Sequence, residues 1–182
     1  MNADRRVETL RRLLYEDSGV QVYGILDGAS IPNLLPLLTQ HGIVNVCLFR
    51  GELDPELAMT APYLVQLPPE SPFTELLLRQ GWGKHWGILA VSSEELRILR
   101  LHFRKFIMVW DPEGKPLYFR YYDPRVLRVY LPTCNTDELH TVFGPVSAYV
   151  LEGEAPDTAW RFTYAGNTLG KDALALLPTP SA

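Results

Sequence analysis

Residues 119–125 read Phe119-Arg120-Tyr121-Tyr122-Asp123-Pro124-Arg125, and within this stretch an expected strand ends and an expected helix begins. Asp123 is a favourable N-cap residue, and Pro124 has the backbone angle that suits a first helical position. The candidate ion pairs are Arg120 with Asp123, and Asp123 with Arg125 or Arg128. The stretch therefore predicts a strand-to-helix corner that contains a charge pair.

The residues just before this corner indicate a hairpin. Trp110-Asp111-Pro112-Glu113-Gly114-Lys115 is rich in turn-forming residues and lies between two apolar runs. We expect strands at 106–110 and 116–122. Together they predict an antiparallel hairpin near 106–122 whose second strand leads directly into the corner.

Further from the corner, expected strands and helices alternate along the chain. Ser71 is an expected helix cap with Pro72 at the first position, and Ser92 and Glu95 have the spacing of a capping box. The pattern predicts an α/β (mixed α+β) fold, with a mixed β-sheet flanked by helices. Strands are expected at 20–26, 44–49, 62–67, 86–91, 146–151 and 158–165, and helices at 4–17, 34–41, 72–81, 93–104, 124–131 and 136–142.

Length and composition indicate one soluble domain. The 182 residues fit a single domain at 1–165, and residues 166–182, with Pro178 and Pro180, are an expected loosely ordered C-terminal tail. The N-terminus lacks the apolar region of a secretory signal, and no apolar run approaches the ~20 residues that span a bilayer. Cys47 and Cys134 are too few for a disulfide framework. We expect a cytoplasmic protein that does not bind a membrane.

Charge and motif content argue against several classes of function. A net charge of −4 disfavours a dedicated nucleic-acid binder, which is usually basic. The four histidines, His41, His85, His102 and His140, form no zinc motif with each other or with the cysteines. The sequence has no serine-nucleophile elbow and no phosphate-binding loop. We therefore predict no catalytic, cofactor-binding or metal-binding residues.

Three aspartates are candidates for a different interpretation. Asp27, Asp111 and Asp123 each follow an expected strand, where α/β enzymes often carry functional groups. Each is also followed at once by glycine or proline, which is typical of turns and helix caps. Structural roles are the favoured interpretation, and a small hydrolase or phosphotransfer enzyme built on these carboxylates is the alternative.

Two segments are candidate partner surfaces. Residues 81–87 form a glycine-rich loop with Trp82 and Trp86, which either cover the core or contact a partner. Arg97, Arg100 and Arg104 share one face of an expected helix. That face is either solvated or a docking surface for an acidic segment, because guanidinium groups bind carboxylates well.

The sequence also resembles a known family over roughly residues 20–150. Phe119 to Leu127 (FRYYDPRVL) closely resembles the signature of the type VI secretion effector adaptors, also called effector chaperones (Tap or TEC proteins). Residues 23–29 (YGILDGA), 61–65 (APYLV), 86–92 with Leu96 and 102–104, and 143–146 resemble further motifs in the same order. Ala61 stands where the family often has glycine.

This resemblance implies a non-enzymatic adaptor without a cofactor. Such a protein binds the N-terminal region of a type VI effector and helps to load that effector onto the VgrG spike protein. Many relatives continue into a longer C-terminal lobe, so cargo recognition here is expected to use another surface if that lobe selects cargo. An immunity-type protein that neutralises a toxin is a further alternative. The motif residues are expected to be structural or partner-binding: Phe119, Arg120, Tyr122, Asp123, Pro124 and Arg125.

Overall fold

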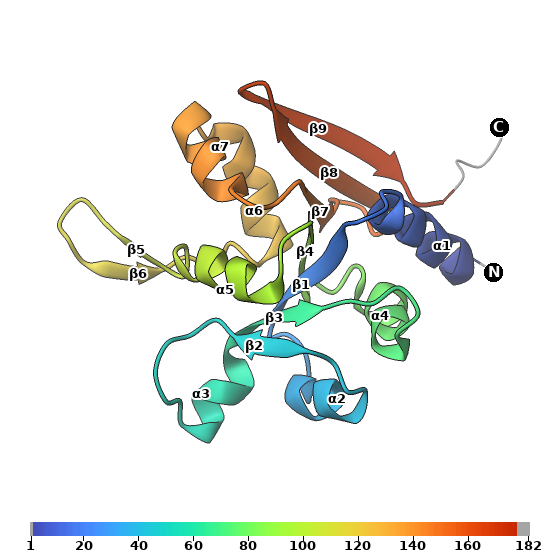
Figure 1. Ribbon diagram of the computed structural model, residues 1–182, viewed down its shortest axis with the longest axis horizontal. Coiled ribbons are helices and arrows are strands. Elements are labelled where there is room, and N and C mark those ends of the chain that lie inside the picture. Colours follow the sequence, from blue (N-terminus) through green and yellow to red (C-terminus); the bar gives the residue numbers. More distant parts are fainter. Residues whose placement is uncertain (1, 178–182) are drawn as a thin grey trace.

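The computed structural model describes residues 2–177 and shows a central sheet with helices on both faces (Figure 1). Seven strands form the sheet in the order β2-β3-β1-β4-β7-β8-β9. The combination of helices and sheet confirms the predicted α+β class. Each pair of neighbouring strands is antiparallel, however, so the predicted mixed sheet is wrong. The strands are β1 (Gln21–Asp27), β2 (Asn45–Cys47), β3 (Pro62–Gln66), β4 (Gly87–Ser92), β7 (Ala148–Glu152), β8 (Thr158–Ala165) and β9 (Thr168–Ala175).

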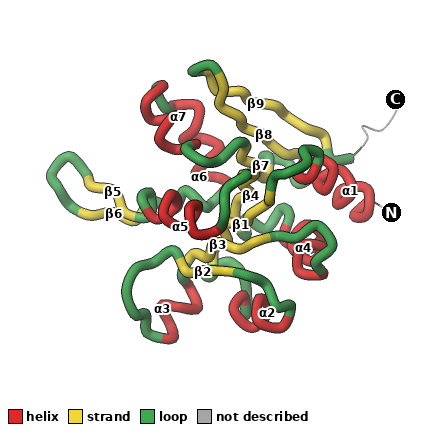
Figure 2. The backbone as a smooth tube through the Cα atoms, in the orientation of Figure 1, coloured by secondary structure: helices red, strands yellow, loops and turns green. Residues whose placement is uncertain are grey.

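Helices cover the sheet in two groups, and in Figure 2 they surround the strands. On one face lie α1 (Asn2–Tyr15), α2 (Leu34–Gln40) and α4 (Pro72–Leu76), which continues into a π-helical turn at Leu77–Gly81. On the other face lie α5 (Leu96–Arg104), α6 (Pro124–Tyr130), a 3₁₀ turn at Leu131–Thr133, and α7 (Thr136–Phe143). A further helix, α3 (Pro55–Thr60), lies beside the edge strand β2 (Figure 1).

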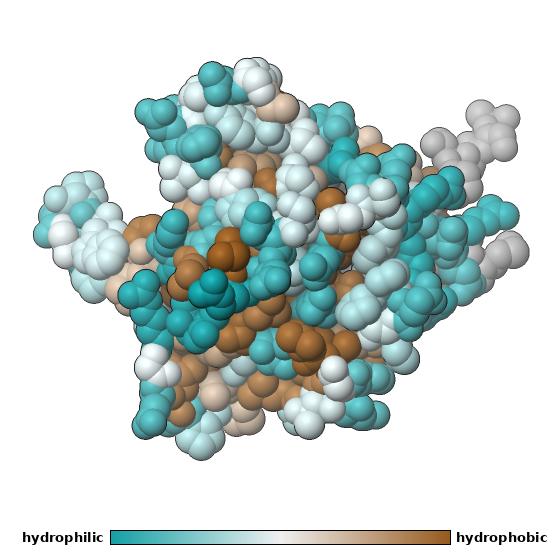
Figure 3. Space-filling model, viewed as in Figure 1, coloured by the Kyte–Doolittle hydropathy of each residue, from teal (hydrophilic) through white to brown (hydrophobic). Residues whose placement is uncertain are grey.

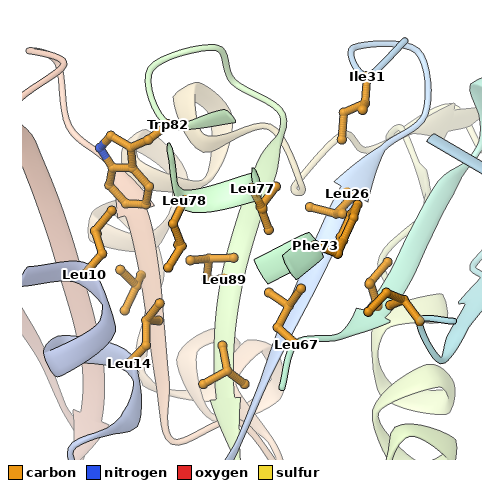
Figure 4. Close-up of a cluster of buried hydrophobic side chains, with 14 of the residues drawn as sticks. Leu10, Leu14, Leu26, Ile31, Leu67, Phe73, Leu77, Leu78, Trp82 and Leu89 are labelled. Carbon is orange, nitrogen blue, oxygen red and sulfur yellow. The ribbon is translucent and has the colours of Figure 1, made fainter. Parts of the chain in front are cut away.

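The central strands β1, β3, β4 and β7 are apolar along most of their length because both faces of the sheet are buried there. In β1, Val22 and Leu26 belong to the first core cluster, whereas Tyr23 and Ile25 belong to the second. Side chains alternate between the faces of a strand, so each strand supplies both clusters. Figure 4 shows the first cluster, in which leucines of α1 and of the α4 segment gather around Leu89 of β4.

Local signals set several helix boundaries as the sequence predicts, but one cap differs. The Ser71 hydroxyl accepts a hydrogen bond from the Phe73 amide, and Pro72 opens α4. The predicted capping box at Ser92 is wrong. Ser92 is buried, and its hydroxyl donates to the Pro145 carbonyl at 2.6 Å, so it joins two segments rather than capping α5, whose N-cap position is Glu95.

The hairpin forms, but its strands are shorter than the sequence predicts. They are β5 (Met108–Trp110) and β6 (Pro116–Tyr118), and Figure 1 shows them projecting from the body of the protein. The carboxylate of Asp111 accepts hydrogen bonds from the amides of Glu113 and Lys115, which holds the turn. The second strand ends at Tyr118, although the Phe119 amide still donates to the Ile107 carbonyl at 3.0 Å, and a turn at 121–122 then leads into α6.

Residues after 165 differ from the tail that the sequence predicts. Thr168–Ala175 is strand β9, which pairs with β8 along its whole length. Gly166 and Asn167 both have positive φ angles, of 55° and 63°, as a two-residue hairpin turn requires. Leu176 is buried in the first core cluster, and residues 178–182 lie outside the described residues.

Within residues 2–177, no helix is both long enough and apolar enough to cross a membrane.

Histidine 102 of α5 is buried in the second core layer. Its Nε2 lies 3.0 Å from the Val142 carbonyl oxygen, and burial lowers the pKa of His102 to about 4. Gly144 lies directly against the imidazole, where a Cβ atom would come within 2.7 Å of the ring. The folded protein therefore holds the neutral imidazole.

We expect this histidine to make folding pH-dependent. Between about pH 6.5 and pH 4 the unfolded chain binds a proton at His102 and the folded chain does not, so stability falls as the pH falls. The loss reaches about 3 kcal/mol for a shift of this size. Denaturant unfolding should show that the free energy of unfolding changes less between pH 7 and pH 4.5 in His102→Gln than in the wild type. The matched variant His140→Gln, at an exposed position, should keep the wild-type difference.

Candidate functional site

The residues of the 119–125 stretch meet the end of the central strand β1. We call this place the motif corner and define it as Asp27, Arg120, Tyr122, Asp123 and Arg125. Arg120 reaches across to β1, where its Nη2 lies 2.6 Å from Oδ2 of Asp27. The corner therefore joins segments 93 residues apart in the chain, and this ion pair is not among those predicted from the sequence.

Asp27 is the most enclosed charge of the motif corner, at 2% exposure. Its Oδ1 accepts a hydrogen bond from the Ala29 amide at 3.0 Å, and its Oδ2 accepts one from the Ser30 hydroxyl at 2.8 Å. Arg120 completes the set. Buried carboxylates are stable when their lone pairs are occupied in this way.

Asp123 caps α6, as the sequence predicts. Its Oδ1 accepts from the Arg125 amide at 2.9 Å, and the Arg125 guanidinium binds both carboxylate oxygens, at 3.0 and 2.7 Å. Burial opposes the ionisation of Asp123, but these bonds from Arg125 outweigh it and hold the pKa of Asp123 below its usual value. Of the candidate ion pairs, Asp123 with Arg125 forms, and Arg128 instead lies 3.6 Å from Glu154.

The aromatic residues of the stretch pack inward rather than on two faces of a strand. Tyr121 and Tyr122 are both buried, and the Tyr121 hydroxyl donates to the Phe103 carbonyl of α5 at 2.9 Å. The Phe119 ring lies 4.9 Å from that of Tyr130. Arg120 sits over the Tyr122 ring at 5.9 Å, and burial raises the pKa of Tyr122. The corner is thus a turn clamped between α5 and α6.

A buried carboxylate, Glu152, holds the glycine-rich loop at 81–87, and this contact was not predicted from the sequence. Both Glu152 oxygens accept from the His85 amide, and His85 Nδ1 lies 2.8 Å from Oε2. Burial raises the pKa of Glu152. Trp82 is only 8% exposed and packs in the first core cluster, so of its two predicted roles it has the one of covering the core. Trp86 is half-buried and covers Gly81.

The three arginines of α5 have different surroundings. Arg97 is exposed and Arg100 is half-buried. Arg104 donates to the carbonyls of Cys47 and Phe49, at 3.1 and 2.7 Å, so it fastens the chain after β2 to the end of α5. None of the three forms an ion pair with a carboxylate of residues 2–177.

An apolar surface lies on the projecting hairpin. Trp110 and Tyr118 are each 65% exposed, and Val109 and Leu117 are also exposed. These residues were not among the candidates from the sequence. The two apolar runs on either side of the polar turn predicted the hairpin, but an apolar run does not show whether its strand is buried in the sheet or exposed to solvent.

The three strand-end aspartates do not share one site. Asp111 holds the hairpin turn, whereas Asp27 and Asp123 lie in the motif corner, where each pairs with an arginine. Among the described residues, no three His, Cys, Asp or Glu side chains form a group that could hold a metal ion. Each aspartate therefore has a defined structural role, as the favoured interpretation expected.

Comparison with known proteins gives one match. Residues 22–141, well over half of the chain, match the model of a family described as a domain of unknown function (DUF4123). Neither the curated proteins nor the solved structures contain a match. The matched range begins in β1 and ends in α7, so it includes the hairpin and the motif corner but not β7, β8 and β9.

Removing the carboxylate of Asp27 should cost more than removing its arginine partner. In Asp27→Ala the Ala29 amide, the Ser30 hydroxyl and Arg120 all lose their acceptor, so we expect a loss of about 3 kcal/mol. Arg120 is half-exposed, and its loss leaves Asp27 with two donors, so Arg120→Ala should cost about 1 kcal/mol. Urea unfolding of both variants measures the order, and equal losses would contradict it.

The cap at Asp123 gives a separate prediction. Asp123→Ala should lower the free energy of unfolding by about 1 kcal/mol, because the α6 N-terminus loses its acceptor. Asp137→Ala, in the first turn of α7 but not at its cap, is the matched control and should change stability much less. Thermal melts compare the two, and an unchanged melting temperature for Asp123→Ala would be the contrary result.

Proposed function

The chain belongs to the DUF4123 family, and from this membership we propose that it is a non-enzymatic adaptor of a type VI secretion system. It binds the N-terminal region of an effector in the cytoplasm of the producing cell and helps to load that effector onto the VgrG spike. The ordered motifs from Tyr23 to Val146, with FRYYDPRVL among them, support this assignment.

The structural observation that carries the proposal is the exposed hairpin. Trp110 and Tyr118 expose large aromatic side chains on a two-stranded ribbon that projects from the sheet (Figure 1). Exposed aromatic residues are enriched where proteins bind other proteins. The hairpin leads straight into the motif corner, which anchors its base to β1 through the Arg120–Asp27 pair.

The motif corner supports this function by fixing the position of the hairpin rather than by contacting the partner. Its carboxylates are occupied by hydrogen bonds and arginines within the chain. Tyr121 fixes the corner to α5, and Phe119 packs against α6. The family signature is therefore proposed to set the position of the binding surface.

Co-purification tests the adaptor function. The full chain is co-expressed with VgrG and with the effector encoded beside it, and it should elute with that effector in size-exclusion chromatography. Deletion of the effector's N-terminal region should abolish the complex. A secretion assay should show loss of effector export when the adaptor is absent. No complex with either protein would refute the proposal, and neutralised toxicity without an effect on export would favour an immunity-type protein.

A further inference from the structure

We propose that a groove beneath the hairpin binds an acidic, partly apolar segment of the effector, an inference that rests on the adaptor function. The groove, which we call the hairpin groove, has a volume of about 460 Å³ and lies between the hairpin, the end of α5 and the chain from Leu48 to Leu57. It lies apart from the motif corner.

The walls of the hairpin groove are apolar. Met108 and Trp110 point to one face of the ribbon, and Tyr118 pairs with Met108 on that face. All three line the groove, whereas Val109 and Leu117 point to the opposite face. The facing wall carries Phe49, whose ring lies 5.5 Å from that of Tyr118, and Leu57, which is 40% exposed.

The charged residues of the hairpin groove all have the same sign. Arg50, Arg104 and Lys105 line it, and no acidic residue does. None of these cations forms an ion pair with a carboxylate of residues 2–177. Burial and the nearby charges of Arg100 and Arg50 lower the pKa of Arg104, so the positive charges crowd one another.

This charge pattern determines the chemistry of the occupant. The whole chain has a net charge of −4, yet three cations, Arg50, Arg104 and Lys105, line this apolar groove. The acidic residues of the same wall, Glu52, Asp54 and Glu56, are exposed and lie outside its lining. Figure 3 shows strongly hydrophilic residues next to hydrophobic ones over the α5 region. A carboxylate between the guanidinium groups would relieve their repulsion, and apolar side chains would cover Trp110 and Tyr118.

Photo-crosslinking identifies the occupant directly. A benzophenone amino acid at position 118 of the full chain, in complex with the effector, should crosslink to the effector, and mass spectrometry should place the crosslink in a segment with both carboxylates and apolar residues. The same amino acid at position 129, equally exposed on α6, should give no such product. A crosslink to VgrG, to a second copy of the chain or to a basic segment would overturn the proposal.

Variants then test the two components of binding by isothermal titration with the effector's N-terminal region. Trp110→Ala should raise the Kd by at least about tenfold, and Lys105→Glu by about tenfold with a reduced dependence on salt. The controls are Val129→Ala, at the same 65% exposure as Trp110, and Arg5→Glu, on α1 at the far side of the sheet (Figure 1). Both should bind as the wild type does.

The outcomes separate this inference from the adaptor function. If the wild-type chain does not bind the effector, the adaptor function itself fails. If the wild type binds but Trp110→Ala and Lys105→Glu bind equally well, the adaptor function stands and the hairpin groove is not the site. Circular dichroism confirms that each variant is folded; Trp110 and Lys105 are exposed, so their substitution should leave the core intact.

Discussion

The ion pair between Arg120 and Asp27 connects the central sheet to the turn between the hairpin and α6. Asp27 ends the central strand β1, and Arg120 lies between the hairpin and α6. Strand β1 is fixed by its pairing with β3 and β4, so the position of the Asp27 carboxylate is fixed too. That carboxylate in turn holds Arg120 and the turn that contains it. Asp27 is the costly side of this pair to remove, because the Ala29 amide, the Ser30 hydroxyl and Arg120 would all lose their acceptor. The position of the hairpin therefore depends on this contact.

A fixed corner matters because the hairpin itself has little support. Its two strands are three residues long, and an isolated hairpin of that size is unstable in water. Tyr121, bonded to the Phe103 carbonyl, and Phe119, packed on Tyr130, hold its base instead. The family signature thus fixes the base of the segment that carries Trp110 and Tyr118, the surface that we propose binds the effector.

The buried acidic residues and the cations near the end of α5 differ in whether they have a partner of opposite charge. The acidic residues that are buried, Asp27, Asp123 and Glu152, are satisfied within the chain. The cations near the end of α5 have no such partner among residues 2–177, although Arg104 also holds two backbone carbonyls. In the proposed adaptor function, these cations would form exposed ion pairs with carboxylates of the cargo, and such pairs form quickly and weaken with salt.

The sequence by itself determined the elements whose signals are local. Ser71 with Pro72 and Asp123 with Pro124 opened helices as expected, and the turn around Asp111 formed, because caps and turns depend on neighbours a few residues apart. The Gly166-Asn167 turn was also local, and it was missed. Only the tertiary structure decided the rest. It paired Arg120 with Asp27 rather than Asp123, buried Trp82, drew Ser92 to Pro145, and brought Arg50 beside Arg104. These contacts join residues far apart in the chain, and no spacing in the sequence specifies which of several arginines or tryptophans the folded sheet will enclose.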